Sequence, residues 1–167
     1  MDIKKEILKY EAMNFNIDQL NIIQMGLENG INISIYANPV FNASQMEEIL
    51  RGLTDGVDIT IYAKPEFDAD QMYIIYLGLK DNLDVSYYAN SKYDFAQMEQ
   101  IRLGLKQKLN VSLYANIKYA AQQMELIRWA LDDKLDSTYI LQSNLNIFQM
   151  QDIYEYLLKR KDAGLDN

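Results

Sequence analysis

The sequence contains no histidine and no cysteine among its 167 residues. Without cysteine there is no disulfide, no thiolate nucleophile and no zinc or iron–sulfur site of the common kinds. Without histidine there is no Ser-His-Asp triad and no imidazole base. Adjacent carboxylates such as Asp132 and Asp133 do not face each other on a helix, so they indicate no acid–base pair. We therefore expect a chain that is not an enzyme and that uses no metal and no cofactor.

Basic side chains are also few, since 16 Lys and Arg stand against 24 Asp and Glu and give a net charge of -8. Binding to a phosphate backbone requires clustered Lys and Arg, so we expect no direct binding of nucleic acid. No stretch approaches the roughly 18 apolar residues that would span a membrane. The charged start, Met1 to Leu8, lacks the features of a signal peptide. We expect a cytoplasmic protein that does not associate with membranes.

A period of 26 residues organises what the sequence does contain. A glutamine recurs at this spacing, each time with an apolar residue after it and an isoleucine four positions on: Gln19, Gln45, Gln71, Gln97, Gln123 and Gln149. A block of Ser or Thr, an apolar residue, Tyr and Ala repeats in phase with it over four units. Periods of this length are typical of repeat architectures, whose units bury their apolar faces only by stacking on their neighbours.

We predict a single repeat domain over residues 1–167. It begins with an N-terminal capping helix at 1–14 and continues through five full repeats at 15–40, 41–66, 67–92, 93–118 and 119–144. A partial repeat at 145–161 serves as the C-terminal cap, and 162–167 form a tail. The end units of a solenoid are atypical because one of their faces meets water. Tyr156 accordingly replaces the glycine that recurs in the earlier units.

The unit 41–66 predicts how each repeat folds. Asn42 is a good N-cap, and apolar residues then recur at helical spacing as far as Leu53. Gly56 follows where a helix stop requires the left-handed conformation, and Asp58 provides a second cap two residues later. We therefore predict a long helix and a short helix, over 59–63, in each unit. The expected fold class is all-α, a short-repeat α-solenoid.

An alternative makes the segment 58–62 a strand, because Ile59 and Ile61 alternate with Thr60 and Tyr62. Stacked units would then form a parallel sheet backed by helices, an α/β horseshoe like that of leucine-rich repeats. The pattern of so short a segment does not decide between helix and strand. The capping column that precedes it favours the helix.

We call the equivalent positions of successive repeats a column. Columns that hold the same residue in nearly every repeat suggest structural roles. The six glutamines are predicted to form a structural ladder, with each amide bonding the backbone of its own loop or of the next repeat. The glycine column, which reads Gly26, Gly52, Gly78, Gly104 and then Ala130, indicates positions where backbones approach closely. The column of Tyr36, Tyr62, Tyr88 and Tyr114 is predicted to be a core row whose hydroxyls reach the rim.

Columns that vary between units are where function is expected. Five side chains of the kinds that dominate protein interfaces fall close together on the long helices: Tyr73, Tyr76, Arg102, Arg128 and Trp129. We hypothesise that they bind a partner, which requires them to lie exposed together. The alternative is that the tyrosines are ordinary surface and that Trp129 fills space left where Ala130 replaces glycine.

Acidic residues are concentrated in the first three units. Glu47, Glu48, Asp68 and Asp70 are the candidates for an acidic face. Such a face could be merely solvated, could attract a basic partner, or could imitate the phosphates of a nucleic acid. The last option requires a continuous surface of acids that are not used as helix caps.

The repeat consensus is roughly F-D-A-x-Q-M-E-x-I-R-x-G-L-K-x-G-L-D-V-S-x-Y-A-N-P over residues 15–157. It resembles tandem arrays in uncharacterised bacterial proteins, and the resemblance implies a mobile-element or phage setting. We expect a non-catalytic repeat scaffold, a monomer or weak homodimer, that binds a protein partner through one face of the solenoid. The alternative function is an acidic inhibitor that imitates nucleic acid and blocks a bacterial or phage enzyme.

Overall fold

The computed structural model describes residues 2–142 and 144–165. Parts of the predicted capping helix, fifth repeat and tail, namely residues 1, 143 and 166–167, lie outside the described residues. The chain divides into two compact units, Met1–Lys80 and Asp81–Asn167, and each is described by itself. The single repeat domain that the sequence predicts stays a prediction.

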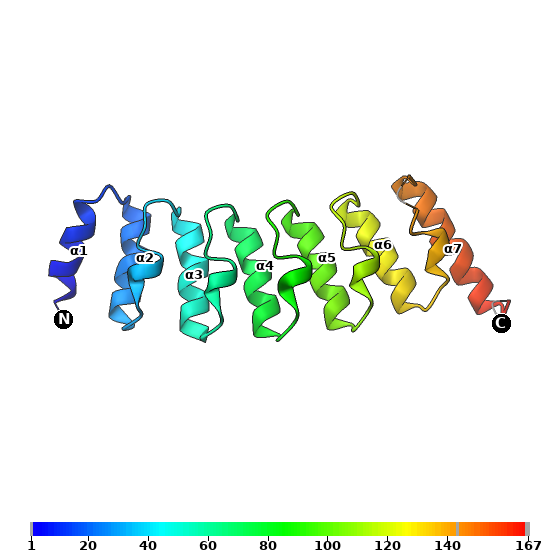
Figure 1. Ribbon diagram of the computed structural model, residues 1–167, viewed down its shortest axis with the longest axis horizontal. Coiled ribbons are helices and arrows are strands. Elements are labelled where there is room, and N and C mark those ends of the chain that lie inside the picture. The colour runs from blue at the N-terminus through cyan, green and yellow to red at the C-terminus, as the bar shows by residue number, and fades with distance from the viewer. Residues whose placement is uncertain (1, 143, 166–167) are drawn as a thin grey trace. The chain divides into compact units, whose positions relative to one another are not determined.

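Long helices pack side by side in chain order within each unit (Figure 1). The first unit contains α1 (Ile3–Glu11), α2 (Ile17–Glu28), α3 (Ala43–Asp55) and α4 (Ala69–Lys80). The second contains α5 (Phe95–Lys106), α6 (Ala121–Asp132) and α7 (Ile147–Asp162). Short 3-10 helices lie between them: η1 (Ile33–Ile35), η2 (Ile59–Ile61), η3 (Val85–Tyr87), η4 (Val111–Leu113) and η5 (Ser137–Tyr139).

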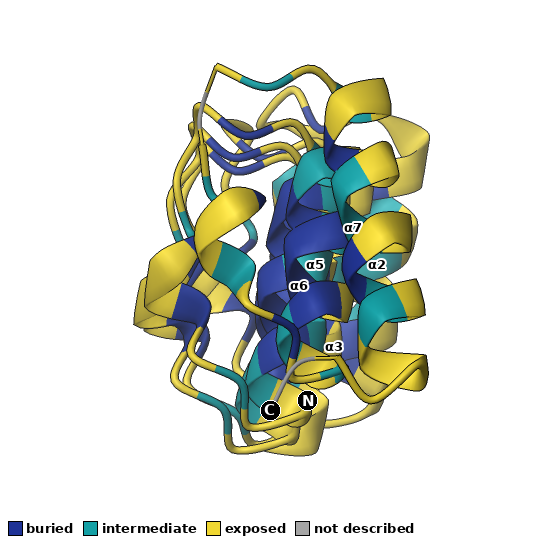
Figure 2. Ribbon diagram, turned by 90° about the vertical axis from the view of Figure 1, so that its right-hand side faces the viewer, coloured by how far each residue is buried: buried dark blue, intermediate teal, exposed yellow. Residues whose placement is uncertain are grey.

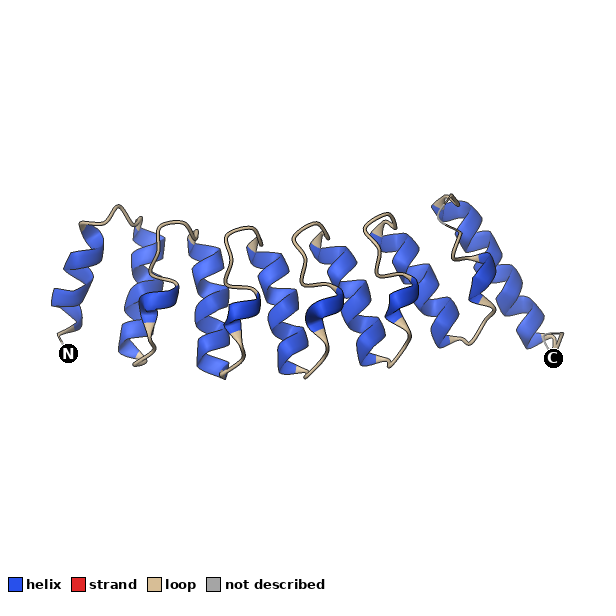
Figure 3. Cartoon of the chain, in the orientation of Figure 1, coloured by secondary structure: helices blue, strands red, loops and turns tan. Residues whose placement is uncertain are grey.

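The prediction of an all-helical solenoid with a long and a short helix per repeat is confirmed (Figure 3). No strand occurs in residues 2–142 and 144–165, so the leucine-rich-repeat-like alternative is not supported. Where that alternative required a strand, Ile59–Ile61 forms a 3-10 turn. The Asp58 side chain accepts a hydrogen bond from the Thr60 backbone N–H at 3.0 Å and so begins this turn as a cap.

The glutamine ladder is also confirmed, and each of its amides that links two repeats has two tasks. The Gln45 Oε1 accepts from the Asn42 backbone N–H at 2.9 Å, and the Asn42 side chain accepts in return from the Gln45 N–H at 2.9 Å. The Gln45 Nε2 donates across to the Phe67 carbonyl of the next repeat at 2.7 Å. The same cross-repeat bond forms from Gln19, Gln97 and Gln123. One buried side chain therefore fixes both the start of a helix and the stacking of its neighbour.

The core follows the stripe that the periodicity predicts. The methionine that follows each ladder glutamine from Gln45 onward, and the isoleucine three residues later, are fully buried in most repeats, as at Met46, Ile49, Met124 and Ile127. Figure 2 colours these buried residues dark blue, and they gather on the side of the helices that faces the short segments. Within each unit, the stripe is therefore buried between the short helices and the long helices of that unit.

Three short segments insert a tyrosine against a helix glycine, at Gly26, Gly52 and Gly104. Tyr62 is fully buried, and its hydroxyl donates to the Glu48 carbonyl at 3.2 Å. A Cβ added to Gly52 would lie 1.8 Å from that hydroxyl oxygen and 2.6 Å from the Ile59 Cγ2. The prediction that the tyrosine hydroxyls reach the rim is therefore wrong, because they end against a helix carbonyl. A tyrosine side chain, and not another backbone, makes the close approach to glycine.

The fifth repeat shows the same constraint by exception. Ala130 stands in the glycine column, and the residue in the tyrosine column there is Ile140. Ser137 replaces the isoleucine or valine that would also crowd the added methyl. Trp129 does not fill this space, since it is partly exposed and lies beside Tyr154, with ring centroids 6.1 Å apart. A smaller short segment is what accommodates the methyl group.

The corner after each long helix keeps a left-handed residue whether or not it is glycine. Gly56 has φ 71°, and Lys108 and Lys134 at the equivalent positions have φ 60° and φ 54°. The closing bonds are alike, for example Val57 N–H to the Gly52 carbonyl at 3.1 Å and Leu109 N–H to the Gly104 carbonyl at 2.9 Å. A side chain in this conformation costs about 1 kcal/mol relative to glycine. Both lysines are therefore placed where the fold would prefer glycine.

Gly52→Ala is expected to destabilise the chain by about 2 kcal/mol, because the new methyl overlaps the Tyr62 hydroxyl. Urea unfolding followed by circular dichroism measures this loss. The triple variant Gly52→Ala, Tyr62→Ile, Ile59→Ser copies the fifth repeat. Its free energy of unfolding should be higher than the value obtained by adding the changes of the three single variants.

The matched control is Ala130→Gly, which removes a methyl that has space and should cost no more than about 1 kcal/mol. Equal losses of unfolding free energy from Gly52→Ala and Ala130→Gly would contradict the inference that the Tyr62 side chain excludes a methyl group at position 52.

Alkaline pH should unfold the chain through the buried tyrosines. Burial raises the pKa of Tyr36 to about 12 and also raises the pKa of Tyr62 and of Tyr114. Since unfolded tyrosine ionises near pH 10, the stabilising contribution is complete below about pH 10 and is lost as the pH rises through about 12. Melting temperature against pH, with tyrosinate absorbance recorded in parallel, tests this. Ionisation of every tyrosine near pH 10 without loss of helix would contradict it.

Candidate functional site

The five helix-face residues predicted to bind a partner are not exposed together. Tyr73 and Trp129 are 40% and 39% exposed, but Tyr76 is 5% and Arg102 and Arg128 are each 8% exposed. The prediction of exposure is therefore wrong for Tyr76, Arg102 and Arg128. Tyr73 and Tyr76 belong to the first unit, and the other three belong to the second.

Tyr76 is buried because it bonds to the end of the preceding helix. Its hydroxyl donates to the Asp55 carboxylate at 2.5 Å, and the Lys80 ammonium donates to the same oxygen at 2.6 Å. These hydrogen bonds, from Lys80 first and then from Tyr76, lower the pKa of Asp55. The Tyr73 ring stacks beside Tyr76 at 6.1 Å, and the Arg51 guanidinium lies 5.6 Å from the Tyr73 centroid.

Arg102 makes the corresponding contacts in the second unit. Its guanidinium donates twice to Glu99, at 2.7 and 2.8 Å, and once to Asp81 at 3.2 Å. Lys106 donates to the same Asp81 oxygen at 3.0 Å. Paired charges with satisfied hydrogen bonds can be covered by neighbouring side chains, which explains why so long a cation is buried.

A single spacing underlies these contacts. In each case the donor lies 21 residues after an acceptor at the C-terminal end of the previous repeat's helix. Arg128 and Gln107 make the same contact at 3.0 Å, and Tyr154 and Asp133 make it at 2.6 Å. We call these four pairs the polar clamps. Sequence reasoning missed the acceptors, although their column reads Asp55, Asp81, Gln107 and Asp133 and so matches the donors in chemistry.

The predicted acidic face is largely occupied by internal contacts. Asp68 caps α4 by accepting the Gln71 backbone N–H at 2.8 Å. Glu48 pairs with Arg51 at 3.1 Å, and Glu47 lies 3.9 Å from the same guanidinium. Burial is the largest influence on Glu48 and raises its pKa. Asp70 is left as the exposed acid of the four without such a role, so they do not make the phosphate-like row that a nucleic-acid mimic requires.

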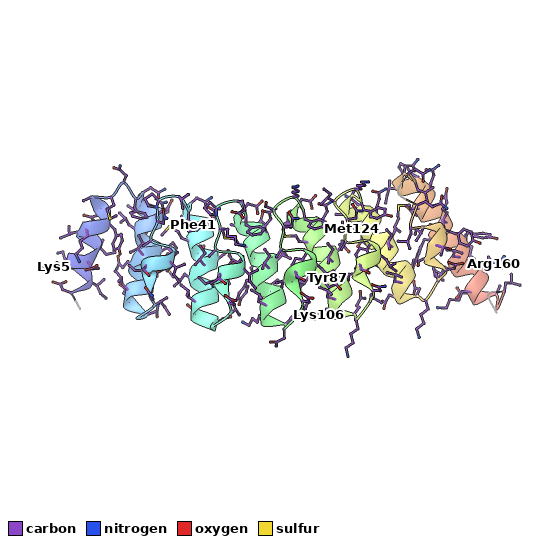
Figure 4. All side chains as sticks on the ribbon, viewed as in Figure 1. Lys5, Phe41, Tyr87, Lys106, Met124 and Arg160 are labelled. Atoms are coloured by element: carbon purple, nitrogen blue, oxygen red, sulfur yellow. The ribbon has the colours of Figure 1, made fainter. Side chains whose placement is uncertain are left out.

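The short 3-10 helices of the second unit carry an exposed apolar row. Their last residues are Tyr87, Leu113 and Tyr139, which are 40%, 40% and 55% exposed. They occupy one column of the repeat, so they recur on the same side of successive repeats (Figure 4 labels Tyr87). We call these three side chains the short-helix face. An exposed apolar side chain that recurs at one repeat position forms a row and not a scatter of single residues, and such a patch is a candidate interaction surface.

This face continues into a groove of about 1040 Å³ between η5 and α7. We call it the end groove, and it is lined by Lys134, Leu135, Asp136, Tyr139, Gln142, Ile153, Tyr156, Leu157, Arg160, Lys161 and Leu165. It exists because no 3-10 segment covers α7 within the described residues, as η5 covers α6. Ile153 is accordingly half-buried, whereas Ile127 at the same position in α6 is fully buried.

The end groove combines apolar walls with cations. The Arg160 guanidinium donates to the Leu165 carbonyl at 3.1 Å and lies 5.8 Å from the Tyr156 centroid. The Lys161 ammonium donates to the Asp133 carbonyl at 2.5 Å. Asp136 is occupied as the cap of η5, accepting from the Thr138 N–H at 3.1 Å. The groove is thus suited to apolar side chains together with anionic groups.

A smaller groove of about 440 Å³ lies on the long-helix side of the same unit. Trp129 and Tyr154 line it together with Leu126 and Ile147. Trp129 is therefore accessible, but the groove is less than half as large as the end groove and has no lysine or arginine in its lining.

Among the described residues there is no cluster of three or more acidic side chains placed to hold a metal ion. No helix in that part of the chain combines the length and the apolar character needed to cross a bilayer. Comparison with protein-family models, with curated proteins and with solved structures finds no significant match to this chain. The resemblance to bacterial tandem-repeat proteins stays a prediction.

The buried clamp at Arg102 should contribute to stability. Arg102→Met leaves the Glu99 and Asp81 carboxylates without the guanidinium that pairs with both, and should cost about 2 kcal/mol in urea unfolding.

Arg51→Met is the matched control, because the Arg51 side chain also pairs with a glutamate three residues earlier but is 42% exposed. It should cost less than about 1 kcal/mol. Equal losses for the two variants would show that burial of the clamp has no energetic consequence.

Proposed function

We propose that this chain is a non-catalytic repeat scaffold that binds a protein partner through the short-helix face of its second unit. The observation that carries this proposal is the in-register exposed row of Tyr87, Leu113 and Tyr139, continued by the end groove. The short-helix face replaces the long helices as the proposed binding surface, since most of the residues hypothesised to bind there are buried in polar clamps.

The exposed row has the chemistry of an interface. Fully burying a large apolar side chain contributes about 1.5–3 kcal/mol, and tyrosine is among the residues that most often dominate binding energy. Tyr139 belongs both to the row and to the end groove, so one partner segment can contact both. The groove provides the concave site in which a central anchor side chain is best desolvated.

The stacking of the helices supports a scaffold role. The glutamine ladder and the polar clamps fix neighbouring helices within a unit through buried and partly buried hydrogen bonds. A preformed surface loses little conformational entropy on binding, which favours affinity. The absence of histidine and cysteine from the sequence supports the non-catalytic part of the proposal.

Site-specific photo-cross-linking tests the proposed face. A photoreactive phenylalanine analogue is placed at Leu113 or at Tyr139, in cells that natively express the chain. Both positions should yield adducts with the same protein, which is then purified and titrated against the chain. Leu113→Asp should weaken that interaction by about tenfold, since it puts a charge into an apolar contact.

The control is the same analogue at Tyr73, which is as exposed as Leu113 but lies on a long helix of the first unit. Adducts with one partner from Tyr73, and none from Leu113 or Tyr139, would overturn the assignment of the face.

A further inference from the structure

The acidic side chains of the second unit are mostly engaged within the fold. Residues 81–167 hold 10 basic and 12 acidic side chains, a difference of -2. Nine of the acids cap a helix or pair with a side chain: Asp81, Asp84, Asp94, Glu99, Glu125, Asp132, Asp133, Asp136 and Glu155. These carboxylates therefore already have partners within the fold, although those of Asp81, Asp84, Asp94, Asp132 and Asp136 remain exposed.

Four lysines of the same unit have no ion-pair partner among the described residues. They are Lys92, Lys108, Lys118 and Lys134, and all four are exposed. The corresponding positions in the first unit hold uncharged or acidic residues, such as Gly56 and Glu66. The repeat itself therefore does not require these lysines.

Two of these lysines stand in strained backbone. Lys108 and Lys134 occupy the left-handed corner that Gly30 and Gly56 occupy in the first unit. Glycine would suit the fold better there, and asparagine, found at Asn82, is the next most tolerant residue. Lysine at such a position in two successive repeats indicates a role outside folding, because strain of this kind is typical of functional sites.

The lysines lie at both ends of the short-helix face. In each repeat the chain passes from the corner into the 3-10 helix and then into the loop that leads to the next long helix (Figure 3). Lys108 therefore precedes Leu113 at the corner end, and Lys118 follows it at the loop end. Lys134 stands at the corner before Tyr139, and Lys92 stands at the loop after Tyr87.

We propose that the short-helix face of the second unit binds an acidic, extended protein segment whose apolar side chains contact Tyr87, Leu113 and Tyr139. Carboxylates of that segment pair with Lys92, Lys108, Lys118 and Lys134. This assignment rests on the proposed function and adds the chemical class of the partner. Packed helices lie about 10 Å apart, and an extended chain rises about 3.3 Å per residue, so an apolar side chain at about every third position fits the row.

A protein segment suits this face better than a nucleic acid. Sequence-independent binding of nucleic acid depends on many phosphate contacts, and the whole chain is acidic, with a net charge of -8. The centre of the face is an apolar row and its cations lie only at the edges, so a continuous polyanion would leave the row without a partner.

The test uses the full chain and a fluorescently labelled Glu–Tyr copolymer, an acidic polypeptide with aromatic side chains, in an anisotropy titration. Wild-type chain should bind it, and binding should weaken as salt is added. The double variant Lys108→Gly, Lys134→Gly should bind about fivefold to tenfold more weakly, as expected for the loss of two ion pairs. Its urea midpoint should rise at the same time, because glycine relieves the corner strain.

Opposite changes in binding and stability separate a binding role from a structural one. The matched control is Lys4→Ala, Lys5→Ala on α1, which alters the net charge equally but lies in the first unit. It should leave copolymer binding unchanged. If the control weakens binding as much as the double variant, the effect is one of total charge and the assignment is overturned.

The other outcomes are equally decisive. Tighter binding to a single-stranded DNA oligonucleotide than to the copolymer would overturn the assignment in favour of nucleic acid. No copolymer binding, together with partner adducts from Leu113 and Tyr139, would overturn the acidic class and leave the proposed function standing. No copolymer binding and no such adducts would overturn both.

Discussion

The structure depends on the hydrogen bonds of one side chain, the glutamine that recurs every 26 residues. Its carbonyl oxygen completes a capping box at the start of its own helix, and its amide group donates to the backbone of the next repeat. Local helix formation and the stacking of repeats are therefore coupled through a single buried group. Because an unsatisfied buried amide is costly, a repeat that starts its helix elsewhere would lose both bonds at once. This accounts for the constancy of glutamine, while the residue before it varies from repeat to repeat.

Two further contacts recur along the chain. The tyrosine of the short segment ends against a helix glycine, and this sets how closely the short segment approaches the long helix. The polar clamps join the middle of one helix to the end of the one before.

The sequence was sufficient to predict the fold but not the site. Helices, caps and left-handed corners depend on neighbouring residues, and the repetition makes each such signal visible several times. The exposure of Tyr76, Arg102 and Arg128 depends instead on partners 21 residues away, and their column lies at the edge of the buried stripe. A long side chain at such an edge can extend into water or fold back onto a neighbour, and only the acceptors at Asp55, Asp81 and Gln107 decide which. The prediction that backbones approach closely at the glycine column is wrong, because a tyrosine side chain makes that approach, and periodicity does not tell which atoms meet.

The two kinds of link between repeats have different consequences for how such a chain can be rearranged. The glutamine bonds to a main-chain carbonyl, which every repeat offers, so the ladder accepts any neighbour. A clamp instead needs matched side chains in two adjoining repeats. One repeat supplies a tyrosine or an arginine, and the repeat before it supplies an acid or an amide. Duplicating or reordering whole repeats would preserve the glutamine ladder, but each new junction would need a matched pair of side chains to form a clamp. The clamps thus form only when the repeats stand in their present order. An array with its repeats permuted would keep its helices but lose the contacts between particular neighbours.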